Sequence, residues 1–205
     1  MLASIQSRAL TVFAALSLLA VSTAEAGPKV GKAAPEWKGT DAAGKAHELK
    51  QYRGKYVVLE WLNHGCPYVQ KHYDSKNMQK LQEEWTKKGV VWLSVISSAK
   101  GKQGNEEGAD ATATAKEKGS HASAILLDSG GAIGKAYEAQ TTPHMFVIDP
   151  KGTLVYAGAI DDKASTDEAD IAGAKNYVSA ALTASMAGKP VEVKTTKSYG
   201  CGVHY

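Results

Sequence analysis

The two cysteines of this 205-residue chain are its clearest candidates for chemistry. Cys66 lies in residues 63–69 (NHGCPYV), and Cys201 lies near the C-terminus between two glycines. A thiolate attacks disulfides and peroxides, and it forms more easily at the N-terminus of a helix, where unpaired N–H groups and the helix dipole favour negative charge. Pro67 suits the first position of a helix, because its missing N–H would be unpaired there. We therefore expect Cys66 to be the N-cap residue of a helix and the nucleophile of a redox site.

The residues around Cys66 predict the elements that hold it. Residues 56–62 form a short run rich in β-branched and aromatic side chains, which is typical of a buried strand. Apolar residues then recur at helical spacing, which predicts one amphipathic helix over 67–88 that Gly89 ends. Residues 90–96 predict a second buried strand. A strand, a helix and a strand in this order predict a parallel βαβ unit.

The rest of the chain predicts further elements of the same domain. In order, we expect a hairpin of residues 37–40 and 46–49, a short surface helix over 106–118, a strand over 124–128, a helix near 129–137, and an antiparallel hairpin of residues 141–148 and 153–158. A capping-box spacing from Ser165 to Glu168 predicts a last helix that Gly188 and Pro190 close. This order predicts a single α/β domain.

The first 26 residues have the pattern of a secretory signal peptide. Arg8 precedes an apolar run over residues 9–20, and Ala24-Glu25-Ala26 is an A-x-A cleavage pattern. The apolar run is shorter than a typical transmembrane helix and no later stretch reaches that length, so we expect no membrane span. We expect a periplasmic or secreted protein, in a compartment where disulfides persist.

Processing would leave one domain and a tail. We expect residues 1–26 to be the signal peptide, residues 27–190 the folded domain, and residues 191–205 a C-terminal tail without a clear period. The formal net charge is +3 at neutral pH, without a basic run. This mild excess gives no indication of a nucleic-acid partner.

Several motifs together resemble the thioredoxin-like redoxins, near the alkyl hydroperoxide reductase and thiol-specific antioxidant group. The motifs are residues 34–37 with Gly44-Lys45, residues 63–69, Thr142-Pro143, residues 156–162, and residues 188–191 with Gly200-Cys201. The resemblance covers residues 30–205 and implies a thioredoxin-like α/β fold with a central mixed β-sheet flanked by helices. It also implies thiol-dependent redox activity without a bound cofactor.

The resemblance also places a substrate-binding loop. Thr142-Pro143 corresponds to the cis-proline loop of thioredoxin-like proteins, which lies beside the reactive cysteine and offers its backbone to an extended segment of a partner. Together with Pro67, these two residues are the expected substrate contacts. The implied partners are a hydroperoxide or a protein disulfide as substrate, and a thiol reductant or a thioredoxin-like reductase.

The chain departs from the family motifs at three positions. Val69 stands where the C-x-x-C motif has its second cysteine, and Leu59 and Asn63 stand where peroxiredoxins have Pro and Thr or Ser. The usual local resolving thiol is therefore absent, and Cys201 is the expected resolving cysteine. His64, two residues before Cys66, is a candidate for stabilising the thiolate or acting as a base. The choice between a peroxide and a disulfide substrate stays open.

Two other readings of the cysteines stay open at this point. Cys66 and Cys201 could form a static disulfide that fastens the tail to the domain. Alternatively, they could bind copper(I) or zinc together with imidazoles, since thiolates and imidazoles are ligands that both metals accept. The candidate imidazoles are those of His64, His144 and His204. The remaining histidines, His47, His72 and His121, are expected at the surface.

Overall fold

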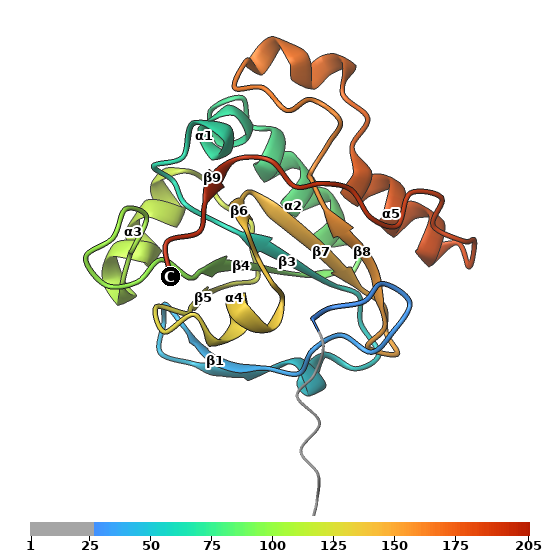
Figure 1. Ribbon diagram of the computed structural model, residues 1–205, viewed down its shortest axis with the longest axis horizontal. Helices are drawn as coiled ribbons and strands as arrows, with labels where there is room; N and C mark the ends of the chain where they lie inside the picture. The colour runs from blue at the N-terminus through green and yellow to red at the C-terminus, as the bar shows by residue number, and fades with distance from the viewer. Residues whose placement is uncertain (1–26) are drawn as a thin grey trace, which may run out of the picture.

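The computed structural model describes residues 27–205, so the expected signal peptide over residues 1–26 lies outside the described residues. A seven-stranded mixed sheet forms the centre of this part of the chain, and helices lie against the sheet (Figure 1). This arrangement confirms the predicted α/β fold with a central mixed sheet. Across the same residues, no helix is both long and apolar enough to cross a lipid bilayer.

The elements confirm most of the predicted order. They are β1 (Lys38–Asp41), β2 (Ala46–Glu48), the 3₁₀ helix η1 (Leu49–Tyr52), β3 (Val57–Trp61), α1 (Pro67–Asp74), α2 (Asn77–Lys87), β4 (Val91–Ile96), α3 (Gly108–Glu117), β5 (Ala124–Leu127), α4 (Ala132–Ala136), β6 (Thr141–Thr142), β7 (His144–Ile148), β8 (Leu154–Gly158), the 3₁₀ helix η2 (Glu168–Gly173), α5 (Tyr177–Met186) and β9 (Cys201–Gly202). Across the main sheet the order is β2-β1-β5-β4-β3-β7-β8. β3 and β4 are parallel, as the βαβ prediction required, and β1–β2 and β7–β8 are the two predicted hairpins.

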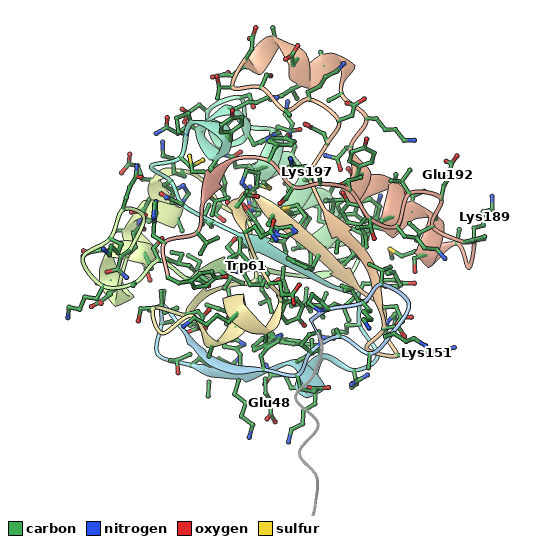
Figure 2. All side chains as sticks on the ribbon, viewed as in Figure 1. Glu48, Trp61, Lys151, Lys189, Glu192 and Lys197 are labelled. Atoms are coloured by element: carbon green, nitrogen blue, oxygen red, sulfur yellow. The ribbon has the colours of Figure 1, made fainter. Side chains whose placement is uncertain are left out.

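Two apolar clusters form the core, one on each face of the sheet. Successive residues of β3 point to opposite faces, so Val58 joins the cluster beneath α1, α2 and α5, and Trp61 joins the other cluster. Trp61 is fully buried in the interior (Figure 2), where its ring lies 5.6 Å from that of Tyr137 and 5.1 Å from that of Phe146. β3 is therefore fixed on both faces, and it holds the turn that leads to Cys66 in a defined place.

The helix expected over residues 67–88 is two helices. α1 ends at Asp74, α2 begins at Asn77, and Lys76 between them has a left-handed backbone with φ of 63°. The Ser75 hydroxyl donates a hydrogen bond to the Lys71 carbonyl oxygen at 2.6 Å, a local bond that competes with helix continuation. The prediction of one helix was wrong because both helices bury their apolar faces against the same side of the sheet, so the apolar spacing continues across the break.

The last helix begins later than the capping-box spacing predicts. The segment after Asp167 is the short 3₁₀ helix η2, and α5 begins only after Asn176, whose side chain accepts a hydrogen bond from the Ser179 amide at 2.8 Å. Ile171, which follows the capping-box residues, lies partly exposed in η2 and not on the apolar face of α5. η2 is part of the long connection between β8 and α5. Figure 1 shows this connection at the top of the view.

The strand expected over residues 141–148 is divided at Pro143. β6 and β7 lie on either side of this residue, and the Thr142–Pro143 peptide bond is cis, as the resemblance implied. β6 pairs with β9 of the C-terminal tail rather than with the main sheet. The tail, for which no regular structure was expected, therefore contributes a strand.

Two of the histidines expected at the surface are buried. The His47 side chain bonds to Asp41 at 2.8 Å and to the Tyr52 hydroxyl, and these contacts fasten the β1–β2 hairpin to η1. His72 of α1 has no exposed surface. The expectation failed because the partners of each imidazole stand elsewhere in the sequence. His121 is exposed, as expected.

Glu60 is a carboxyl group with no exposed surface in the middle of β3. It accepts hydrogen bonds from the hydroxyls of Tyr73 at 2.9 Å and Ser94 at 3.1 Å, from the Gln82 amide at 3.0 Å, and from the Trp92 indole at 2.7 Å. Buried carboxyl groups are stable only when such donors satisfy their oxygens. Because Tyr73 and Gln82 belong to α1 and α2, the network ties both helices to the sheet.

The buried carboxyl predicts a pH dependence of stability. Burial raises the pKa of Glu60 despite the four donors. A carboxyl whose pKa is higher in the folded protein contributes stability below its unfolded pKa of about 4.3, and this contribution is lost as the pH rises through the folded pKa. We expect the stability of the wild type relative to Glu60→Gln to fall as the pH rises from about 4 upward, as measured by urea denaturation at each pH. A difference that stays constant over this range would contradict the expectation.

Candidate active site

Cys66 lies at the corner between β3 and α1. It is the N-cap residue of α1 with extended backbone angles, and Pro67 occupies the first helical position. Its amide donates to the Asn63 carbonyl oxygen at 3.0 Å, and its carbonyl oxygen accepts from the Val69 amide at 2.9 Å. The local sequence therefore folds as predicted: the strand ends, a tight turn follows, and the helix begins with the thiol at its N-terminus.

The polar contacts of the Cys66 sulfur come from two distant segments. The thiol donates to the Thr142 carbonyl oxygen at 3.1 Å, and the sulfur accepts a hydrogen bond from the Cys201 amide at 3.3 Å. Thr142 and Cys201 are direct partners in the antiparallel pairing of β6 with β9. The helix start, the cis-proline loop and the tail thus meet at one sulfur atom, and the Cys66 side chain has no exposed surface.

The two thiols have opposite tendencies to ionise. Burial alone would raise the pKa of Cys66, but hydrogen bonds, foremost those from the Cys201 side chain and amide and then those with Val69 and Thr142, together outweigh burial and hold that pKa below its usual range. Burial, and then the neighbouring Cys66 sulfur, raise the pKa of Cys201 to about 12. Both residues are free thiols in the structure. Cys66 is therefore the thiol that ionises first, and a thiolate is the reactive form.

This arrangement predicts how Cys66 responds to loss of its neighbour. Cys201→Ala removes a side-chain hydrogen bond that favours the Cys66 thiolate, so we expect the pKa of Cys66 to rise. The ultraviolet absorbance of the thiolate, followed in a pH titration, measures the change. Val203→Ala, a change in the same tail that leaves both thiols in place, serves as the control. An unchanged Cys66 titration in Cys201→Ala would show that the Cys201 side chain does not set its acidity.

His64 lies beside α1, and its ring is turned toward Tyr73. The two rings meet edge to face with centroids 4.9 Å apart. Burial and then the charge of Lys118 lower the pKa of His64 to about 4, so the imidazole is neutral at physiological pH. Its Nδ1 is buried and has no hydrogen-bond partner within residues 27–205. None of the hydrogen bonds to the Cys66 sulfur in the same range comes from His64.

One of the three expected substrate contacts bonds directly to the buried sulfur. Thr142 is buried and supplies the carbonyl oxygen that accepts from the Cys66 thiol, while its own hydroxyl oxygen has no hydrogen-bond partner within residues 27–205. Pro143 follows through the cis bond, and Pro67, the residue after Cys66, is exposed. The structure therefore brings Thr142 into direct contact with the candidate nucleophile.

Of the imidazoles considered as metal ligands, that of His144 has other partners. The His144 ring packs on Phe146 with centroids 4.4 Å apart, its Nδ1 accepts a hydrogen bond from the Gln140 amide at 3.3 Å, and burial lowers its pKa to about 4. The carbonyl oxygen of His204 accepts from the Ala99 amide. Over residues 27–205, no group of three or more His, Cys, Asp or Glu side chains is arranged to hold a metal ion.

A second group of residues anchors the tail near the thiols, and no sequence pattern predicted it. The Tyr199 hydroxyl, two residues before Cys201, donates to Asp161 at 2.5 Å and lies 3.4 Å from His72 Nε2. Burial lowers the pKa of His72 to about 4, so the ring is neutral beside the Asp161 carboxylate. These three residues come from the tail, the segment after β8, and α1, which are far apart in the sequence.

Comparison with known proteins finds a matching family and similar sequences. Residues 30–157 match the AhpC/TSA family. A curated relative, the thiol-disulfide oxidoreductase ResA of Bacillus thuringiensis subsp. konkukian, is 28% identical over 133 residues, which cover 65% of this chain and 71% of that protein.

Solved structures share the fold. An uncharacterized conserved protein from Geobacillus kaustophilus superimposes with a TM-score of 0.77 at 25% identity, over 86% of this chain and 92% of that one. The thioredoxin domain of a thiol-disulfide oxidoreductase from Bacteroides vulgatus superimposes with a TM-score of 0.51 at 23% identity, over 63% of this chain and 87% of that domain. With a helix-capping cysteine, a cis-proline loop beside it and more than half of its length matched, this chain belongs to the AhpC/TSA family and has a thioredoxin-like fold.

Proposed function

We propose that this protein is a thiol-disulfide oxidoreductase in which Cys66 and Cys201 form one redox couple. The observation that carries the proposal is the pairing of β6 with β9, which sets the Cys201 amide 3.3 Å from the Cys66 sulfur. The name of the ResA relative supports a disulfide as substrate. The substituted positions Leu59 and Asn63 also favour a disulfide, because in peroxiredoxins the corresponding residues shape the peroxide pocket.

The proposed reaction is a pair of thiol-disulfide exchanges. The Cys66 thiolate attacks one sulfur of a substrate disulfide, which forms a mixed disulfide and releases the other substrate sulfur as a thiolate. Cys201 then attacks the Cys66 sulfur, its proton passes to the departing substrate thiolate, and a Cys66–Cys201 disulfide remains. The substrate gains two electrons and the protein loses two. A thiol reductant or a reductase partner returns the protein to the dithiol form.

Cys201 becomes a better nucleophile during this sequence. The neighbouring Cys66 sulfur is one of the causes that raise the Cys201 pKa to about 12. Once Cys66 is part of a mixed disulfide, its sulfur no longer carries charge, so this cause disappears. The order of events is therefore set by the site: Cys66 reacts first, and Cys201 is activated by that reaction.

The deciding experiment compares two substrate classes on residues 27–205. We expect the protein to accelerate reduction of insulin disulfides by dithiothreitol more strongly than it accelerates consumption of a hydroperoxide. Non-reducing mass measurement should find a loss of two hydrogen atoms in the oxidised protein, as an internal Cys66–Cys201 disulfide requires. If the protein accelerates hydroperoxide consumption more strongly than insulin reduction, its substrate is a peroxide and not a disulfide. Failure in both assays would overturn the proposal.

We also propose that the chain acts outside the cytoplasm, after cleavage before Gly27. The support is the sequence pattern of residues 1–26 and a pair of thiols that would persist as a disulfide in an oxidising compartment. Expression of the full chain in a bacterium, followed by N-terminal sequencing of the periplasmic fraction, tests this. Recovery of the uncleaved chain from the cytoplasm alone would contradict it.

A further inference from the structure

Residues 199–205 form a strap that covers the active site. The strap contains β9, which pairs with β6 in the register Thr141 with Gly202 and Thr142 with Cys201. Figure 1 shows it crossing between the start of α1 and β6. Cys66 beneath it has no exposed surface, and within residues 27–205 β9 is the one strand that pairs with β6. A large substrate therefore cannot reach the sulfur while the strap is in place.

The fit of the strap depends on one glycine. Gly200 has a φ of 136°, a conformation that residues with a side chain rarely adopt. A Cβ atom at this position would lie 2.0 Å from the Thr142 carbonyl oxygen, whereas a Cβ atom at Gly202 would meet none of the described residues within 4 Å. The backbone of the strap therefore approaches the cis-proline loop as closely as a glycine allows.

Hydrogen bonds hold the strap on both sides of Cys201. Before it, the Tyr199 hydroxyl donates to Asp161. After it, the Val203 amide donates to the Gln140 carbonyl oxygen at 3.0 Å, and the Tyr205 hydroxyl donates to the Ala139 carbonyl oxygen at 2.8 Å. Tyr199 and Val203 are only partly buried, and Tyr205 is exposed. A terminal segment held in this way can open locally without global unfolding.

We infer that the strap and an extended, cysteine-bearing polypeptide substrate occupy the same strand position beside β6. The strap itself shows what fits there: an extended backbone that pairs with Thr141 and Thr142 and presents a cysteine to Cys66. When the strap opens, β6 presents an unpaired strand edge, and addition of a strand to such an edge is a general mode of peptide binding. The inference rests on the proposed function for the reaction that follows binding.

Shared occupancy couples resolution to product release. The partner strand pairs with β6, and the Cys66 thiolate attacks its disulfide to give the mixed disulfide and a free thiolate. Return of the strap brings Cys201 to the Cys66 sulfur, and attack there breaks the mixed disulfide, forms the internal disulfide and frees the second substrate thiol. The returning strap pairs with β6 again and displaces the substrate strand, so the reduced product leaves the site.

The test compares Gly200→Ala with Gly202→Ala, each combined with Cys201→Ser so that Cys66 is the single thiol. The first change blocks docking of the strap, and the second is its matched control. Under native conditions, we expect a maleimide to modify Cys66 about tenfold faster or more in the Gly200→Ala protein. A fluorescent peptide of residues 196–205 with Ser at position 201 should bind the Gly200→Ala protein at least about tenfold more tightly, by anisotropy. Equal rates and equal affinities would overturn the inference.

A second variant that should release the strap serves if Gly200→Ala does not fold. The measurements also distinguish failure of this inference from failure of the proposed function. Tyr199→Phe removes the bond to Asp161 and should also accelerate modification of Cys66, so it replaces Gly200→Ala if that protein lacks the circular dichroism of the wild type. Neither modification nor peptide binding requires turnover. Slow insulin reduction by the wild type, with fast modification of the Gly200→Ala, Cys201→Ser protein, would reject the proposed function and keep the strap. Fast insulin reduction by the wild type, with equal modification rates in the two double variants, would reject the strap.

Discussion

Cys66→Ser lowers the rate of insulin disulfide reduction by on the order of a thousandfold or more, because the hydroxyl is not ionised at neutral pH and cannot form the mixed disulfide. The sulfur is the atom on which the helix start, the Thr142 carbonyl oxygen and the Cys201 amide converge. Initial rates at a fixed dithiothreitol concentration, corrected for the rate without protein, measure the effect.

The control for this prediction is a measurement that shows whether the variant still folds. Serine is close to cysteine in size, so the far-ultraviolet circular dichroism of Cys66→Ser should match that of the wild type. Val69→Ala serves as a second control, because it shortens a buried side chain on the same helix and leaves both thiols in the chain. Insulin reduction by Cys66→Ser at the rate of the wild type would refute the assignment of Cys66 as nucleophile.

Cys201→Ser separates the first exchange from the second. Cys66 keeps its place at the start of α1, so one equivalent of substrate should still react, but the mixed disulfide has no internal thiol to resolve it. We expect steady-state insulin reduction to fall by about ten- to a hundredfold, since only external thiol then releases the product. Mass spectrometry after a single turnover should detect the mixed disulfide in this variant and the internal disulfide in the wild type.

The matched control is Gly202→Ala, which adds a methyl group beside Cys201 where the described residues leave open space. It should retain both the rate and the internal disulfide. If Cys201→Ser cycles as fast as the wild type and accumulates no mixed disulfide, Cys66 works alone with external thiol, and Cys201 has no role in turnover.

The corner at Cys66 could be predicted from the sequence because its determinants are local. A β-branched run, a glycine and a proline at the first helical position act on adjacent residues, and the structure has the strand, the turn and the helix start that they imply. The break at Lys76 escaped prediction because apolar spacing reports which face of a helix is buried and not whether the helix is continuous. Two helices that pack on one side of a sheet give the same pattern as one.

The rest of the site depends on contacts between residues that are far apart in the sequence. The tail has no periodic pattern, and β9 exists because β6 offers it a partner. His72 lies buried beside Tyr199 and Asp161, and no feature of its neighbours along the chain distinguishes it from a surface histidine. Counting thiols could nominate Cys201 as the partner of Cys66, but the close approach of Gly200 to Thr142 could be found only in three dimensions.

The separation of the two thiols along the chain links oxidation to folding. Cys66 and Cys201 stand 135 positions apart, so their disulfide would close a ring around most of the domain. In the chain-entropy description, a loop of this length lowers the entropy of the unfolded chain enough to stabilise the folded form by roughly 4–5 kcal/mol. By thermodynamic reciprocity, the native fold promotes disulfide formation by the same free energy. In the proposed reaction, part of the free energy that drives electron donation would therefore come from stabilisation of the whole domain. A dithiol whose sulfurs lie within one helical turn closes a much shorter loop and would gain less from it.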